Sequence, residues 1–115
     1  MIGKLDRDRL TDMLEHAEAA VEIVGMLEPA GLAADRVRYL AAQKALEVIG
    51  EAANRMSPAG RDALPAIPWR MIIDMRNYLI HAYRTVRPEI VVGTVRHDLP
   101  ALIPMLQDLL AEDAP

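Results

Sequence analysis

Apolar residues recur at helical spacing along most of the chain, and Pro and Gly interrupt the pattern at intervals. A residue every three or four positions lines one face of an α-helix. Segments 28–31 (EPAG) and 57–60 (SPAG) each combine Pro with Gly, which favours turns. The pattern therefore predicts an all-α, up-and-down bundle of four to five helices with short connections. The first helix, from about residue 5 or 9 to 27, turns inward Leu10, Met13, Leu14, Ala17, Val21, Val24 and Leu27.

The same spacing predicts the remaining helices. Pro68 suits the first turn of a third helix that ends near residues 83–85, and Pro88 suits the start of a fourth. Pro100 and Pro104 are expected to break or bend the chain beyond that fourth helix, leaving a last segment at 101–110. The second helix, at about 34–56, has an inner stripe of Val37, Leu40, Ala41, Ala45, Val48, Ile49, Ala52 and Met56. The inner positions of the third are Met71, Ile72, Met75, Leu79 and Ile80.

Length and composition limit the class of protein. A chain of 115 residues suits one domain, and 52% apolar residues are enough for a core. There is no Cys, so disulfides and thiolate metal sites are excluded, and no two His stand at metal-ligand spacing, so we expect no metal site. The charged start, MIGKLDRDRL, is not a signal peptide, and no apolar run is long enough to cross a membrane. We therefore expect a cytoplasmic protein.

The charge is distributed unevenly. The formal net charge is −4, which by itself argues against a strong nucleic-acid binder. Within residues 69–97, however, five Arg stand against two acidic residues, so this segment carries +3 and the rest carries −7. Arginine is suited to bidentate contacts with phosphate. The positive charge surrounds one octapeptide, RNYLIHAY at residues 76–83.

This octapeptide carries polar residues that a structural helix does not need. His81 can exchange a proton near neutral pH, and Arg76 can stabilise negative charge on a phosphate. Asn77 can orient His81 or a substrate oxygen. The set suits metal-free RNA cleavage, in which the ribose 2′-hydroxyl attacks the adjacent phosphorus. Arg76 and His81 point about 140° apart on one helix, so a break of the helix near His81 or a second copy of the chain would be needed to bring them together. The reaction needs one base and one acid, and a two-fold dimer would supply the pair.

A structural interpretation of each residue stands beside this one. Arg76 could belong to a surface ion pair, and His81 could stabilise a helix C-terminus. Tyr83 could be a ring at the edge of the core. We interpret Gly50 as a site of close helix packing and Glu51 as structural, although it could bond an Arg.

Arg84 and Arg87 flank the octapeptide, and either role fits them. They could contact RNA phosphates, or they could be solvated charges at the surface.

The pattern Arg76-x4-His81-x-Tyr83, with Asn77 directly after the Arg, resembles the R-x4-H-x-Y motif of HEPN-domain toxins. More specifically, the chain resembles the HepT family, partners of minimal nucleotidyltransferase (MNT) antitoxins. The likeness is clear from about residue 41 to residue 110. It extends over residues 44–56 (KALEVIGEAANRM), 67–83 (IPWRMIIDMRNYLIHAY) and 88–106 (PEIVVGTVRHDLPALIPML).

The resemblance implies one HEPN domain over residues 1–115, an all-helical bundle that forms a homodimer. It implies a metal-independent endoribonuclease toxin in which Arg76 and His81 are catalytic, Asn77 supports them and no cofactor is required. It also implies a partner, the MNT antitoxin, which transfers AMP from ATP to Tyr83. An adenylate there would block the phosphate site beside Arg76.

Two other classes of function stay open. The chain could be a non-catalytic binding module that serves as partner and protein substrate of a nucleotidyltransferase, or a purely structural helical dimer. Four polar residues in one octapeptide argue against the last. Replacement of His81 separates the first two, because only a nuclease needs it.

Overall fold

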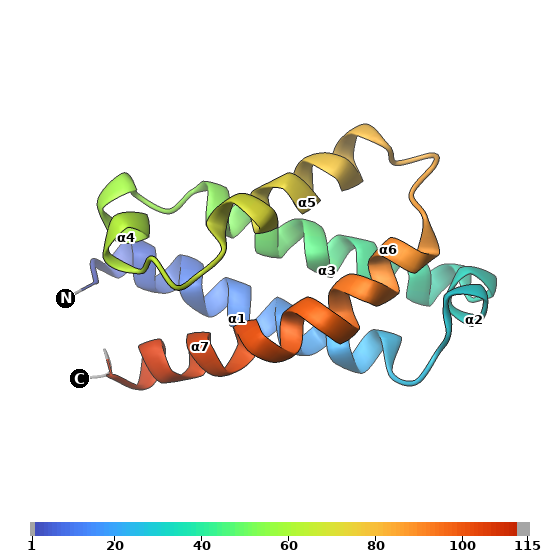
Figure 1. Cartoon of the computed structure of the whole chain (residues 1–115), viewed down its shortest axis with the longest axis horizontal. Coiled ribbons are helices and arrows are strands. Elements are labelled where there is room, and N and C mark those ends of the chain that lie inside the picture. Colours follow the sequence, from blue (N-terminus) through green and yellow to red (C-terminus); the bar gives the residue numbers. More distant parts are fainter. Residues whose placement is uncertain (1, 113–115) are drawn as a thin grey trace.

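The computed structural model describes residues 2–112, and every regular element in them is helical, which confirms the predicted all-α class (Figure 1). Four long rods form the bundle, and two short helices, α2 and α4, lie in the connections. None of the described helices is long and apolar enough to span a membrane. The elements are α1 (Lys4–Val24), α2 (Pro29–Ala34), α3 (Arg36–Asn54), α4 (Pro58–Ala63), α5 (Trp69–His81), α6 (Pro88–Gly93), the π-helical segment η1 (Thr94–Asp98) and α7 (Leu99–Glu112).

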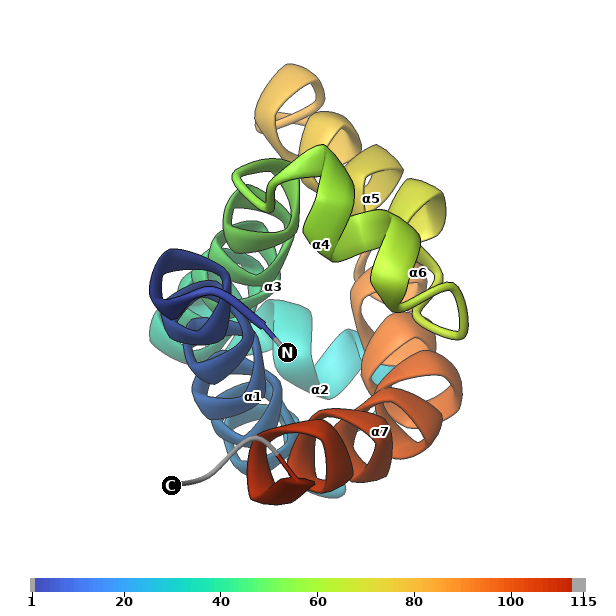
Figure 2. The same ribbon diagram turned by 90° about the vertical axis from the view of Figure 1, so that its left-hand side faces the viewer.

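The long helices alternate in direction, and the described chain begins and ends at the same end of the bundle (Figure 1). Helix α3 packs between α1 and α5, and α7 packs along the other side of α1. Seen from the end, α1, α3, α5 and the α6–α7 rod surround the core in that order (Figure 2). This arrangement leaves α5 supported mainly by α3.

Local chemistry sets the helix ends in the first half. Gly25 adopts a φ of +53°, which L side chains rarely tolerate, and its N–H donates to the Val21 carbonyl. Helix α1 therefore ends at Val24, before the expected residue 27. Pro29 then starts α2 inside a segment predicted to be only a turn, since Pro suits the first helical position. The Asp35 carboxylate accepts the Arg38 N–H and caps α3.

Of the break or bend predicted at the prolines, the break is wrong. Pro100 lies in the first turn of α7 and Pro104 inside it, and the chain runs from Pro88 to Glu112 as one helical rod. The wider π-helical turn at Thr94–Asp98 precedes Pro100, with the Leu99 N–H bonding to the Thr94 carbonyl. Leu99, Leu102 and Leu106 bury the inner face of α7, and this packing outweighs the N–H groups that the prolines lack.

Several residues predicted to point inward are instead exposed. Val37 and Leu40 of α3 are 79% and 51% exposed, and Met71 and Ile80 of α5 are 46% and 37% exposed. Val21 is also exposed. The true inner face of α3 consists largely of small residues, and it allows α1 and α5 to approach on either side. These buried α3 residues are Ala42, Ala45, Leu46, Ile49, Gly50, Ala52 and Ala53.

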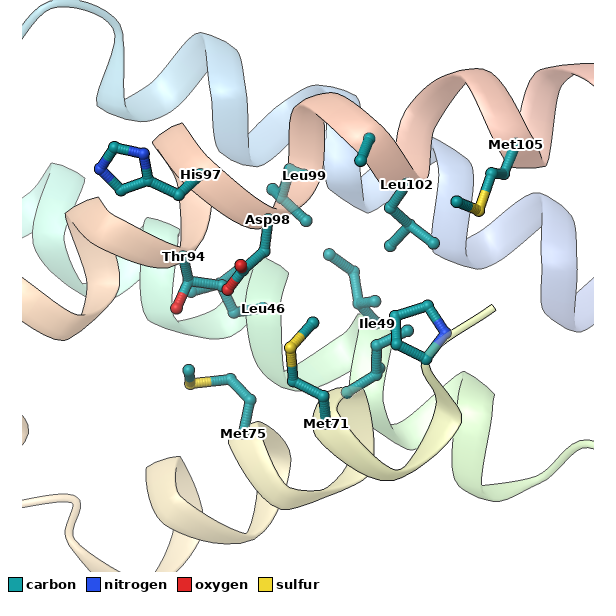
Figure 3. A pocket seen from close by; sticks show the side chains of 13 residues that line it. Leu46, Ile49, Met71, Met75, Thr94, His97, Asp98, Leu99, Leu102 and Met105 are labelled. Carbon is teal, nitrogen blue, oxygen red and sulfur yellow. The ribbon is translucent and has the colours of Figure 1, made fainter. Parts of the chain in front are cut away.

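An apolar cleft of about 180 Å³ separates α5 from α7. Met71 and Met75 point into it from α5, and Leu102 faces them from α7 (Figure 3). Arg76, Asn77, His81 and Tyr83 do not line it.

Candidate functional site

Arg76 lies where α5 comes closest to α3. A Cβ added to Gly50 of α3 would collide with the Cβ of Arg76, and it would also lie 3.1 Å from the backbone oxygen of Ile72. Only a residue without a side chain permits this approach. The predicted role of Gly50 as a close-packing residue is thus confirmed, and that packing fixes the position from which the Arg76 side chain extends.

Two hydrogen bonds orient the guanidinium of Arg76. Its Nε–H donates to Oε2 of Glu51 at 2.9 Å, and its Nη1 donates to Oδ1 of Asn77, also at 2.9 Å. Glu51 accepts a second bond from Nε of Arg55 at 3.1 Å. Burial raises the pKa of the Glu51 carboxyl, but the bonds from Arg55 and Arg76 lower it by more. The pKa of Glu51 therefore lies below its ordinary value. Glu51 is therefore an anion that holds Arg76. The bonds to Glu51 and Asn77 use Nε and Nη1 of Arg76 and do not involve its Nη2.

His81 is the last residue of α5, and its side chain is exposed. Its Nδ1 lies 2.8 Å from the backbone oxygen of Asn77. A carbonyl oxygen only accepts, so Nδ1 carries the proton and Nε2 of the neutral ring is the acceptor. The arrangement presents Nε2 as a base that a substrate hydroxyl can reach.

Tyr83 follows α5 directly in the turn and is 68% exposed. Its hydroxyl accepts a hydrogen bond from Nε of Arg84 at 3.2 Å, and the Arg84 guanidinium also lies over the ring. Tyr83 and Arg84 form part of the wall of a hollow of about 580 Å³, to which α3 contributes Arg36 and Lys44. The Tyr83 side chain is therefore exposed beside a hollow that carries three cations and Glu47.

Two other tyrosines hold the turn that carries Tyr83. The Tyr78 hydroxyl accepts the Arg87 N–H at 2.9 Å, and the Tyr39 hydroxyl donates to the Val86 carbonyl at 2.7 Å. Burial, with smaller contributions from Tyr78 and Glu89, raises the pKa of the Tyr39 phenol, which keeps it a donor. Sequence reasoning missed both tyrosines, because neither belongs to the motif spacing.

The structure brings some of the predicted site residues together and leaves others apart. Arg76 contacts Asn77 through its side chain, whereas Asn77 reaches His81 only through its backbone carbonyl. No hydrogen bond joins Arg76 to His81 in the described part of the chain, as their angular separation predicts. Arg87 lies 4.0 Å from Glu89. Glu51, interpreted from sequence as structural, is a direct partner of Arg76.

Residues 2–112 contain no cluster of three His, Cys, Asp or Glu side chains able to hold a metal ion. Within the octapeptide, the Arg76 guanidinium is held by Glu51 and Asn77, and the His81 imidazole is exposed.

Comparisons with known proteins match nearly the whole chain. The family model described as "Ribonuclease HepT-like" matches residues 13–109. The "Probable ribonuclease HepT" of Thermococcus cleftensis is 34% identical over 96 residues, which cover 84% of this chain and 87% of that protein. A "Putative RNase" of Caldanaerobacter subterraneus subsp. tengcongensis is 29% identical over 110 residues, covering 96% and 98% of the two chains. No solved structure gives a significant match.

Proposed function

The chain belongs to the HepT-like ribonuclease family, and from this premise we propose that it is a metal-independent endoribonuclease that acts as a toxin. The observation that carries the proposal is the tautomer of His81, with the proton on Nδ1. Its Nδ1 is engaged by the Asn77 carbonyl at 2.8 Å, which leaves the exposed Nε2 to take a proton. Arg76, oriented by Glu51 and Asn77, supplies the positive charge that a phosphoryl group requires.

The proposed reaction is an internal transfer within RNA. Nε2 of a neutral His81 removes the proton of the ribose 2′-hydroxyl, whose oxygen attacks the adjacent phosphorus. The bond to the 5′-oxygen breaks, and a protonated His81 from the second subunit gives that oxygen its proton. Arg76 stabilises the charge that develops on the non-bridging oxygens. The products are a 2′,3′-cyclic phosphate and a free 5′-hydroxyl.

The experiment that tests this activity uses single-stranded RNA in the presence of EDTA. The purified protein is expected to cleave it and to leave 2′,3′-cyclic phosphate ends, identified by mass spectrometry. The control substrate carries 2′-deoxyribose at the cleaved position, and it should remain intact. Cleavage of that deoxy substrate, or cleavage that needs added Mg²⁺, would refute the mechanism. No cleavage by a folded, unmodified protein would favour the non-catalytic module.

The homodimer that this mechanism needs has a suitable surface beside the site. Leu40 of α3 and Ile80 near the end of α5 expose apolar area on the side that carries Arg76. A second copy placed over this surface would cover the apolar side chains and bring two His81 residues to one groove. The proposed interface is this α3–α5 face.

Replacement of Ile80 by Asp is expected to weaken the dimer and to abolish RNA cleavage together. A buried charge without a partner costs about 3 kcal/mol or more, which is at least roughly a 100-fold rise in the dissociation constant. Sedimentation equilibrium measures the change. The matched control is Met26→Asp, since Met26 is 92% exposed in the turn after α1. An Ile80→Asp protein that stays dimeric would place the interface elsewhere.

We propose Tyr83 as the residue through which a nucleotidyltransferase antitoxin controls the toxin. The phenol oxygen would attack the α-phosphorus of ATP, pyrophosphate would leave, and the phenolic proton would pass to a base. The new phosphodiester would lie among Arg84, Arg36 and Lys44, whose charges would hold it over the site. This supports adenylylation as a block of RNA binding.

Tyr83→Phe is the variant that tests this control. It keeps the ring and removes only the oxygen, so we expect RNA cleavage within about twofold of the wild-type rate, because the motif's Arg76 and His81 do not contact it. With the cognate nucleotidyltransferase and ATP, the wild-type protein should gain AMP and lose activity, and Tyr83→Phe should do neither. Intact-mass spectrometry follows the transfer, and modification of the Phe variant would exclude Tyr83 as the acceptor.

A further inference from the structure

A polar groove of about 330 Å³ runs from Arg76 toward the N-terminal half of α1. Helices α1, α3 and α5 all contribute to its walls, and it adjoins the candidate site because Arg76 and Ile80 belong to it. None of the predicted site residues except Arg76 lines it. The groove is lined by Arg9, Asp12, Lys44, Glu47, Val48, Glu51, Ala52, Arg55, Arg76 and Ile80.

Three of the four cations in this groove have an acidic partner. Arg55 and Arg76 share Glu51, and Nζ of Lys44 lies 4.0 Å from Glu47. Arg9 differs. Within residues 2–112 its Nε is buried and has no hydrogen-bond partner, and no acid stands at ion-pair distance from it.

The acid whose pKa Arg9 lowers is Asp6, and its carboxylate is hydrogen-bonded to Ser57. The Asp6 carboxylate accepts the N–H of Ser57 at 2.9 Å and also its hydroxyl. These bonds, more than the attraction of Arg9, hold the pKa of Asp6 below its ordinary value. Asp6 thus fastens α1 to the start of α4 and does not neutralise Arg9. The Arg9 side chain therefore lines the groove with a positive charge that no hydrogen-bonded acid neutralises.

The chemistry of this groove fits a phosphodiester. Its four cations exceed its three carboxylates by one charge, which matches a single backbone phosphate. A guanidinium binds two phosphate oxygens at once, and the wall leads directly to Arg76, where the scissile phosphate is proposed to lie. We propose that Arg9 binds the RNA backbone phosphate next to the scissile one, which makes α1 part of the substrate site. This proposal rests on the proposed ribonuclease function.

The test compares binding of a 2′-O-methyl RNA, which cannot be cleaved, over a series of salt concentrations. Arg9→Ala is expected to weaken binding about tenfold at low salt and to lower the slope of log K against log salt by about 0.7, the value for one lost contact with a single strand. With cleavable RNA, KM should rise while kcat stays within about twofold. Arg9→Lys, which keeps the charge without the planar fork, should fall between the two proteins.

The matched control is Arg70→Ala, which removes the same charge from an exposed position on α5 that lines a different hollow. If Arg9→Ala and Arg70→Ala give the same affinity and salt slope, the inference fails while the ribonuclease proposal stands. If the wild-type protein binds no RNA, both fail. Should Arg9→Ala not fold, the Nε–Hε NMR resonance of Arg9 in the wild type decides, because RNA must shift it if the contact exists.

Discussion

Replacing His81 with Ala is expected to lower kcat for RNA cleavage at least about 100-fold, the usual loss when a general base is removed. KM should change little, because Arg76 still binds the phosphate. The exposed His81 side chain makes no packing contact that folding needs, so the urea midpoint should stay close to that of the wild type. Single-turnover cleavage assays and urea unfolding measure the two effects on the same preparation. Expression of the variant in a bacterial host should also no longer arrest growth.

The chain supplies a matched control for this change. His16 lies on α1, and its Nδ1 approaches the Asp12 carbonyl at 2.8 Å, the same distance and the same four-residue spacing as His81 and Asn77. His16→Ala therefore removes an equivalent hydrogen bond outside the octapeptide, and cleavage should persist. If both variants cleave RNA at the wild-type rate, His81 takes no part in the chemistry. If both lose activity, the loss reflects folding.

Gly50→Ala is expected to damage stability and cleavage together. The new methyl group would overlap the Cβ of Arg76, which cannot move unless α5 moves with it. Overpacking of this kind costs about 1–3 kcal/mol, against a gain in helix propensity of about 1 kcal/mol. A displacement of α5 by about 1 Å also shifts Arg76, and misplacement on this scale lowers a rate by about 100-fold. Urea unfolding and single-turnover cleavage measure the two losses.

Gly93→Ala isolates the effect of the collision from that of the substitution. Gly93 also lies within a helix, and a Cβ there would meet nothing within 4 Å. Alanine should stabilise the protein by up to about 1 kcal/mol through helix propensity, with no change in cleavage. A Gly50→Ala protein as stable and active as Gly93→Ala would show that α5 adjusts to the methyl group without cost.

Periodicity predicted the all-α class and the long helices, because an amphipathic helix records its buried face in its sequence. The prediction of buried residues was wrong on helices that also carry exposed apolar residues. Val37, Leu40 and Ile80 follow the helical pattern yet point outward, since the pattern marks apolar residues without distinguishing a core from an exposed face. The proline rule failed at Pro100, where a π-helical turn and the packing of α7 keep the rod continuous.

The octapeptide could be located from sequence, but its supports could not. Arg76, Asn77, His81 and Tyr83 are close along the chain, so their spacing and the family resemblance together single out a candidate site. Glu51 and Arg9 reach the same region from α3 and α1, and their proximity to Arg76 arises only when three helices pack. Gly50 gave a signal because a glycine inside a helix usually has a packing reason. Arg9 gave none.

The one-sided support of α5 has a consequence for control of the protein. α5 rests on α3 through Gly50, and the apolar cleft separates its other side from α7. Elements with few neighbours open locally at a lower free energy than the whole domain unfolds. The helix that carries the octapeptide can therefore loosen and lose the geometry of Arg76 while α1 and α3 stay folded. For the proposed ribonuclease, loss of packing along this cleft would therefore lower activity without unfolding the whole domain.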